Sequence, residues 1–319
     1  NQYIMKFKKP KFWDYKKPSF ISYLLLPISI LIKSINLLKI FITKRKIEHI
    51  KTICVGNIYL GGTGKTSLSL KINEILNKKK IKTCFIKKFY SSQIDEQNLL
   101  EINGKLFSDK KRINSLKQAS TEGFEVAIFD DGLQDFSIDY DFNIVCFNSL
   151  NWIGNGLTLP SGPLRERIKN IKKYKNIFIN GNDENLEEIK EYINKIDPNI
   201  NIYQGKYIPK NLDEFNLKDK FLVFSGIGNH KTFVSMLKIN NFNIIKDIEY
   251  PDHYQYSIKE LENFISISKN LDCKIITTEK DFMRIKKINY DKIKFIKVDL
   301  KILNEKKFLK DISKIYEKN

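Results

Sequence analysis

The sequence predicts an α/β protein, in which a parallel sheet with helices on both faces is joined to a second α/β lobe and an N-terminal amphipathic helix associates with a membrane. Three observations support this prediction. A glycine loop lies between a strand-like and a helix-like segment, strands and helices alternate after it, and an apolar stretch lies between basic clusters near the N-terminus. We expect a membrane-associating segment at 1–46, a first lobe at 47–164 and a second lobe at 165–319, whose last helix packs back on the first.

The N-terminal segment has the pattern of an interfacial anchor. Residues 1–17 mix lysines with aromatic residues, and the most apolar stretch, 20–42, follows. Its longest uncharged run, 19–32, has 14 residues, fewer than the ~20 that a spanning helix needs. On a helical wheel Ser22, Ser29, Lys33, Asn36 and Thr43 share one narrow face, and Lys44-Arg45-Lys46 closes the segment. Aromatic residues and cations at headgroup level are typical of peripheral or monotopic attachment.

Two other interpretations of this segment compete. A cleaved signal peptide lacks support, because no small-residue cleavage site precedes the glycine loop. A buried pair of helices broken at Pro27 stays open.

The first lobe is organised around Gly61-Gly62-Thr63-Gly64-Lys65-Thr66, between a β-branched run at 50–55 and helical spacing from Leu68 to Leu76. This context predicts a nucleotide-binding P-loop of the NTPase type, in which backbone N–H groups cradle phosphates. Lys65 would reach the terminal phosphates of ATP, and Thr66 would place its hydroxyl on Mg²⁺. The sequence departs from the common pattern G-x-x-x-x-G-K-[ST] at Tyr59, where glycine is usual.

Asp130 and Asp131 follow the apolar strand 126–129. This is the position of the carboxylate that holds Mg²⁺ in P-loop proteins. An Asp-Gly turn after a strand is the simpler alternative. Further strands are expected at 82–86 and 144–147, and the polar segment 87–123 shows less regular structure.

Residues 151–168 are rich in glycine and proline, which indicates a hinge. Alternation then resumes, and we expect a cleft between two lobes. The strands of this second set are expected at 176–180, 221–225, 244–248, 274–277 and 293–298, and its helices at 184–195, 231–238, 258–269 and 304–317.

The net charge is +19, from 56 basic and 37 acidic residues, which favours anionic partners such as a membrane surface or a phosphorylated substrate. Basic motifs interleaved with aromatics are lacking, so nucleic acid is not expected. The four cysteines (Cys54, Cys84, Cys146 and Cys273) have no C-x-x-C spacing and are expected to be reduced core residues of a cytoplasmic protein. Of the three histidines, His49 is expected at the surface, while composition does not choose a role for His230 or His253.

Seven motifs in order give the chain a specific resemblance. It resembles the tetraacyldisaccharide 4′-kinase (lipid A 4′-kinase) family over roughly residues 50–285, and its amphipathic N-terminus is also similar. The motifs are Gly56-Asn57 with the glycine loop, Asp130-Asp131-Gly132-Leu133-Gln134, Gly154-Asn155-Gly156, Pro160-Ser161-Gly162-Pro163-Leu164-Arg165-Glu166, Gly226-Ile227-Gly228-Asn229, Pro251-Asp252-His253 and Thr277-Thr278-Glu279-Lys280-Asp281.

The resemblance implies a kinase at the cytoplasmic face of the inner membrane. It would transfer the γ-phosphate of ATP, with Mg²⁺, to the 4′-hydroxyl of an acylated glucosamine disaccharide 1-phosphate. The family's catalytic aspartate and histidine map to Asp95 and His253, which would act together on the sugar hydroxyl. Arg165 and Glu166 match a pair near the phosphates and substrate.

The chain also departs from the family pattern. Lys87-Lys88-Phe89-Tyr90-Ser91 stands where Ser-Arg-Gly-Tyr-Gly is usual, and Asp135 stands where histidine is common. These changes bear on site geometry and substrate preference. The main alternative function is a membrane-associated P-loop ATPase switch without a lipid acceptor. The lack of an Asn-Lys-x-Asp motif disfavours GTP, and the apolar anchor disfavours a nucleic-acid-associated NTPase.

Overall fold

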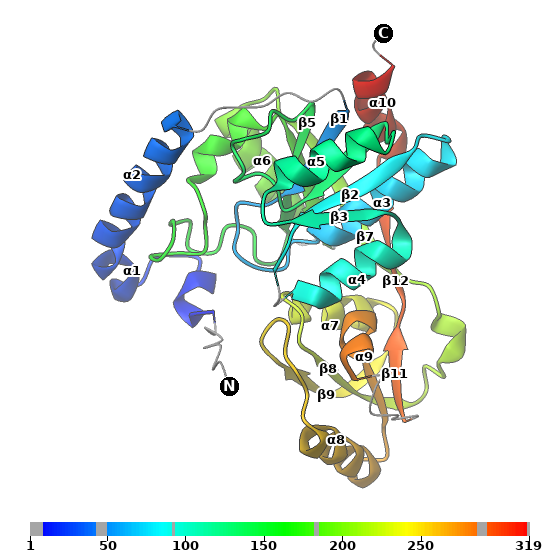
Figure 1. Cartoon of the computed structure of the whole chain (residues 1–319). Coiled ribbons are helices and arrows are strands. Elements are labelled where there is room, and N and C mark those ends of the chain that lie inside the picture. Colours follow the sequence, from blue (N-terminus) through cyan, green and yellow to red (C-terminus); the bar gives the residue numbers. More distant parts are fainter. Residues whose placement is uncertain (1–8, 43–49, 91–92, 182–184, 286–291, 318–319) are drawn as a thin grey trace.

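The computed structural model describes residues 9–42, 50–90, 93–181, 185–285 and 292–317, and its strands form two sheets (Figure 1). The larger sheet has eight strands in the order β12-β7-β6-β5-β1-β4-β2-β3, and only β12, against β7, is antiparallel. Its strands are β1 (Lys51–Gly56), β2 (Thr83–Lys88), β3 (Leu106–Asp109), β4 (Val126–Asp130), β5 (Phe142–Asn148), β6 (Asn176–Asn180), β7 (Asn201–Pro209) and β12 (Val298–Ile302).

Helices cover both faces of the large sheet, as predicted. On one face, Ile53 and Val55 of β1 pack with α3 and α10, while Cys54 faces the opposite core with α5 and α6. This alternation reflects the two-residue period of a strand whose faces are both buried. The helices of this lobe are α3 (Lys65–Lys78), α4 (Ile94–Asn103), α5 (Arg112–Thr121), the short η3 (Ile168–Lys173), α6 (Leu186–Ile196) and α10 (Glu305–Tyr316).

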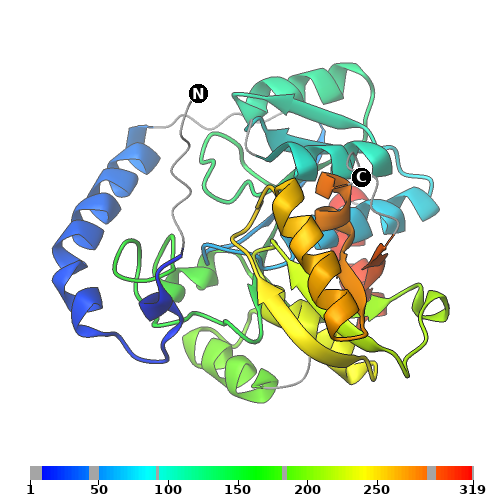
Figure 2. The same cartoon turned by 90° about the horizontal axis from the view of Figure 1, so that it is seen from below.

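The smaller sheet is parallel, with the order β11-β10-β8-β9. One apolar cluster packs it against α7, and another packs its other face against α8 and α9. Figure 2 shows this lobe beside the large sheet. Its elements are the short η4 (Leu212–Glu214), β8 (Lys220–Ser225), α7 (His230–Ile239), β9 (Asn243–Glu249), α8 (Ile258–Asn270), β10 (Lys274–Thr278), α9 (Glu279–Ile285) and β11 (Ile293–Ile296).

The two sheets do not divide at residue 165, where we expected the second lobe to begin. β6 and β7 extend the large sheet beyond β5, and β12 and α10 return to it. The expected single strand 293–298 is in fact two strands, since β11 ends at Ile296 in the small sheet and β12 starts at Val298 in the large one. The segment 87–123, expected to be less regular, contains α4, β3 and α5.

The N-terminal segment forms the short η1 (Lys11–Asp14), α1 (Phe20–Leu24) and α2 (Leu26–Ile42), and the two α-helices lie at one edge of the molecule (Figure 1). The helices divide at Leu25 rather than Pro27. Their serine face is buried: Ser29 Oγ lies 2.8 Å from Ser161 Oγ, and Asn155 Nδ2 donates to Ser22 Oγ at 3.1 Å.

The apolar side of these helices points outward. Phe20, Leu24 and Leu31 are 83%, 69% and 62% exposed. The alternative of a buried helix pair is therefore wrong. Within the described residues, the search for a helix long and apolar enough to cross a membrane finds none. Lys44-Arg45-Lys46 and His49 lie outside the described residues.

The four cysteines are free thiols, as predicted. Cys54, Cys84 and Cys146 are buried in the large sheet, and burial raises the pKa of the Cys84 thiol to about 12. Such thiols stay protonated and unreactive near neutral pH.

Candidate active site

The P-loop joins β1 to α3 and is held from within. Gly61 and Gly64 have φ of 142° and 81°, a region that favours glycine. The Asn57 amide donates to the carbonyl of Gly61 and to the hydroxyl of Thr63, at 3.2 and 3.0 Å. These bonds fix the loop in a curled shape, so the predicted cradle is compatible with the backbone.

Tyr59, which departs from the usual glycine, points away from the cradle. It is 1% exposed and its hydroxyl donates to Asp14 Oδ1 at 2.9 Å, with Lys9 also in contact. Leu60 N donates to Pro163 O at 2.8 Å. The two residues that precede the glycine loop, Tyr59 and Leu60, therefore attach it to the N-terminal segment and to the loop that follows β5.

The second lobe touches the P-loop directly. Asn229 Nδ2 donates to Gly62 O at 3.3 Å, and a Cβ built on Gly228 would lie 2.5 Å from Gly62 N. Positions 62 and 228 therefore both need glycine, so that the backbone of the P-loop and the backbone of the second lobe can approach each other.

Thr66 and Asp130 meet at the C-terminal end of β4. Thr66 Oγ1 donates to Asp130 Oδ2 at 3.2 Å, and Asp130 is fully buried. Asp130 Oδ1 has no hydrogen-bond partner among the described residues. A buried carboxylate oxygen without a partner beside a hydroxyl fits a Mg²⁺ site, because Mg²⁺ usually takes one or two carboxylates and completes its shell with phosphates and water. The described residues contain no cluster of three or more His, Cys, Asp or Glu that could hold a metal alone.

Asp131, which has a left-handed φ of 62°, turns toward two cations. Arg165 binds it in a bidentate manner, at 2.9 and 3.2 Å, and Lys65 Nζ lies 3.9 Å from it. Burial opposes ionisation, yet these cations lower the pKa of Asp131 to about 2. Arg165 and Lys65 of the P-loop thus share the carboxylate of Asp131.

Glu166 lies elsewhere. Its carboxylate accepts from Tyr174 Oη at 2.5 Å and from Asn170 Nδ2 at 2.9 Å; Asn170 lies in η3 and Tyr174 directly follows it. No contact of the described residues brings it to the P-loop, so the structure does not support a pair of Arg165 and Glu166 acting together. Asp135, where the family commonly has histidine, lies 3.4 Å from Arg112 Nη1.

Asp95 and His253 come together although they belong to different lobes. His253 Nδ1 lies 2.9 and 3.0 Å from the two oxygens of Asp95. Arg284 Nη2 donates to Asp95 Oδ2 at 2.5 Å. The pairing needs no further movement of the lobes.

The electrostatics of this pair follow from its contacts. Burial alone would raise the pKa of Asp95, but hydrogen bonds from His253 and Arg284 hold it well below its usual range. Burial alone would lower the pKa of His253, but the hydrogen bond to Asp95 and the nearby negative charges of Asp252, Asp95 and Glu96 together outweigh it, so this pKa is raised. The ionised carboxylate therefore orients the imidazole and favours its protonated form.

Arg284 is itself fixed by the second lobe. It donates to Gly226 O and to Asp281 Oδ1, both at 2.7 Å. Asp281 is fully buried and also accepts from Tyr256, from Thr278 and from the backbone of Gly226. This network explains why the Thr-Thr-Glu-Lys-Asp stretch matters: it supports the arginine that holds Asp95.

Sequence reasoning missed Lys87, Glu96, Lys280 and Arg284. Lys87 Nζ lies 2.6 Å from Asp130 Oδ2 and 2.7 Å from Glu96 Oε2, and Lys280 Nζ lies 3.3 Å from Glu96 Oε1. Glu96 follows Asp95 directly and Lys280 stands inside the Thr277–Asp281 motif, which was the available signal. Lys87 was noted only as a departure from the usual serine, and that departure does not by itself predict ion pairs with Asp130 and Glu96.

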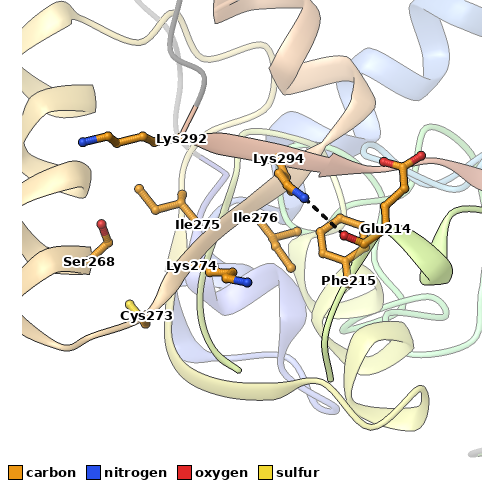
Figure 3. Close-up of a pocket in the computed structure, with 9 residues that line it drawn as sticks. All are labelled: Glu214, Phe215, Ser268, Cys273, Lys274, Ile275, Ile276, Lys292 and Lys294. Carbon is orange, nitrogen blue, oxygen red and sulfur yellow. Dashed lines mark hydrogen bonds between the residues drawn. The ribbon is translucent and has the colours of Figure 1, made fainter. Parts of the chain in front are cut away.

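A cavity of about 300 Å³ lies in the second lobe, away from these residues (Figure 3). Residues of η4, α8, β10 and β11 line it, and Lys294 Nζ donates to Glu214 O at 3.2 Å. It includes none of the predicted site residues.

Comparisons with known proteins identify the family of the chain. A family model described as tetraacyldisaccharide-1-P 4′-kinase matches residues 21–317. The chain belongs to this family. A tetraacyldisaccharide 4′-kinase of Pelagibacter ubique (strain HTCC1062) is 61% identical over 99% of this chain and all of its own length. One of Rickettsia canadensis (strain McKiel) is 32% identical, over 96% of this chain and 98% of its own.

A solved structure has the same fold. The crystal structure of LpxK from Aquifex aeolicus in complex with ATP aligns with a TM-score of 0.68 and 22% identity, covering 93% of this chain and 99% of that one. The likeness supports the predicted fold: a P-loop lobe with a second α/β lobe.

Proposed function

We infer that the protein transfers the γ-phosphate of ATP to the 4′-hydroxyl of a tetraacyldisaccharide 1-phosphate, a step of lipid A biosynthesis. Family membership carries the activity, since both curated relatives are tetraacyldisaccharide 4′-kinases. The observation that carries the chemistry is the Asp95–His253 pair, joined to the P-loop side of the molecule through the neighbouring Glu96. An ATPase switch without a lipid acceptor needs no base for a sugar hydroxyl.

We assign the phosphates of ATP to the loop 61–66, with Lys65 at the terminal phosphates. Thr66 and Asp130 would hold Mg²⁺, with Asp131 close by, and the ion would neutralise charge on the phosphates. Arg165 stands beside Asp131 and Lys65, where it would contact phosphate oxygens. ATP is the ligand named for the related Aquifex structure.

His253 is proposed as the general base. Its Nδ1 faces Asp95, so the hydroxyl proton would be taken at Nε2, which lies 3.8 Å from Asp252 Oδ1. Asp95 is too acidic to be a strong base, and its role is to orient the ring and stabilise the imidazolium that forms.

The test is transfer of labelled γ-phosphate from ATP to detergent-dispersed tetraacyldisaccharide 1-phosphate, with hydrolysis of ATP alone as the control. Lipid-dependent labelling that disappears in the Lys65→Ala variant is the expected result. ATP hydrolysis without any labelled lipid would favour the ATPase switch instead.

We also propose that α1 and α2 attach the protein to the cytoplasmic face of the inner membrane, as a peripheral or monotopic anchor. The exposed apolar side of these helices supports the proposal, because burying each CH₂ in a bilayer contributes about 0.8 kcal/mol. The basic residues nearby would add attraction to anionic lipids.

The anchor is tested with vesicles that contain anionic phospholipid. The triple variant Phe20→Ser/Leu24→Ser/Leu31→Ser should lose co-sedimentation. A matched control removes two exposed isoleucines elsewhere, Ile102→Ser/Ile239→Ser, which are 69% and 61% exposed. Equal binding by the triple variant and the control would contradict the anchor.

A further inference from the structure

Lys87 is a buried cation in the middle of the site. It lies near the C-terminal end of β2 and is 3% exposed. Its ammonium contacts Asp130 Oδ2 at 2.6 Å and Glu96 Oε2 at 2.7 Å. It therefore bridges the proposed metal carboxylate to α4, which in Figure 1 lies between the large sheet and α9 of the second lobe.

The two oxygens of Asp130 have different surroundings. Oδ2 is engaged twice, by Lys87 and by the Thr66 hydroxyl at 3.2 Å. Oδ1 is buried and has no hydrogen-bond partner among the described residues. A buried carboxylate oxygen without a hydrogen-bond partner destabilises the fold unless a cation or a water molecule binds it. Lys87 thus saturates one oxygen and leaves the other for an incoming ion.

The local charge balance is positive. Three carboxylates (Asp130, Asp131 and Glu96) are linked by ion pairs to four cations (Lys65, Lys87, Arg165 and Lys280), a difference of one positive charge. Without Lys87 the same cluster would be neutral, and Asp130 and Glu96 would lose the ammonium that they share.

We propose that Lys87 is a positioning residue that acts as a built-in counter-ion: it keeps free Mg²⁺ out of the nucleotide-free site and attracts the phosphates of ATP, so that the metal enters with the nucleotide. The proposal rests on the nucleotide-binding role assigned above. A positive cluster repels a free divalent cation and attracts a polyanion, and in a partly buried site both effects are stronger than in water.

Two affinities that should change in opposite directions test this idea. The Lys87→Met variant keeps the aliphatic stem and removes the charge. We expect it to bind free Mn²⁺, used as a Mg²⁺ probe and followed by paramagnetic resonance, about tenfold or more tightly than the unmodified protein. We expect its calorimetric affinity for ATP in EDTA to fall by about the same factor. The Lys87→Arg variant, which keeps the charge, should restore both values.

The matched control is Lys88→Met, which makes the same charge change one residue along β2, where Lys88 stacks 5.4 Å from the Tyr90 ring centroid. Both of its affinities should stay within about twofold of the unmodified protein, because Lys88 is only partly buried and solvent and salt screen its charge more than that of Lys87. A merely structural role for Lys87 would weaken both affinities together. That result, or no change in either, would overturn the proposal.

A second variant keeps the test decisive if Lys87→Met fails to fold by circular dichroism. Glu96→Gln leaves Lys87 with one carboxylate, so Mn²⁺ should bind more weakly and metal-free ATP more tightly. Changes of the other sign would contradict the idea. If the unmodified protein binds no ATP at all, with or without Mg²⁺, the assignment of the nucleotide site itself is wrong.

Discussion

The Asp95–His253 pair predicts strong non-additivity in a double-variant cycle. Removing a general base typically lowers the rate by about 10²–10⁴. If Asp95→Asn and His253→Ala each cost about 10³, independent roles would give about 10⁶ in the double variant, whereas one functional unit would give about 10³. The distance of 2.9 Å between Nδ1 and Oδ1 favours one unit. In energy, the coupling would be about 4 kcal/mol, because each tenfold change in rate is about 1.36 kcal/mol.

The structure also indicates that these variants remain folded. In Asp95→Asn, Arg284 keeps Asp281 and the carbonyl of Gly226, so no cation is left buried and unpaired. The assay is kcat for labelled γ-phosphate transfer, with ATP affinity and thermal unfolding measured alongside. Multiplicative losses in a well-folded double variant would refute the reasoning and give Asp95 and His253 separate roles.

The remaining predictions concern the loop, pH and lobe contact. Lys65→Ala should abolish transfer with little change in thermal unfolding, and near-normal activity would contradict the P-loop assignment. The base must be neutral, and the pKa of His253 is raised above its ordinary 6.5, so the acid limb of kcat/KM should lie above pH 6.5. The Asp95→Asn variant should move that limb to lower pH. An unmoved limb would count against His253 as the base. The same pairing stabilises the fold below about pH 6.5 and is lost as pH rises through the raised pKa. Gly228→Ala should destabilise the protein by about 1–3 kcal/mol, because its Cβ would meet Gly62 N at 2.5 Å; unchanged denaturant unfolding would argue against that contact.

The sequence allowed much of the fold to be predicted because its signals are local. The run 50–55, the glycines and the helical spacing after Thr66 fall within one short stretch, and buried parallel strands show as continuous apolar runs. The assignment of strands to sheets is not local. Nothing in 176–180 shows that β6 pairs with β5, and one residue, Lys297, separates strands of different sheets.

The site was predictable to a similar extent. Asp95 and His253 came from a resemblance, and their contact depends on how the lobes pack, which spacing does not determine. Lys87 was missed because a buried lysine is recognisable only from its carboxylate partners, one on β4 and one on α4. Glu166 was paired with Arg165 through the family resemblance, yet its carboxylate binds Tyr174 and Asn170, because neighbouring residues in a loop can face opposite ways.

The attachment of the N-terminal segment has a geometric consequence for catalysis. Trp13 donates to Pro160 O at 3.0 Å, Ser29 contacts Ser161, and Tyr59 joins Asp14 next to the P-loop. Helices that enter a bilayer would thus fix the height and tilt of the ATP site relative to the bilayer surface. If the proposed acceptor lipid has its acyl chains in the same bilayer, diffusion in two dimensions would deliver the sugar to the phosphate at a constant distance from the surface. Variants of Ser29 or Trp13 would then disturb the reach of the enzyme while leaving its chemistry unchanged.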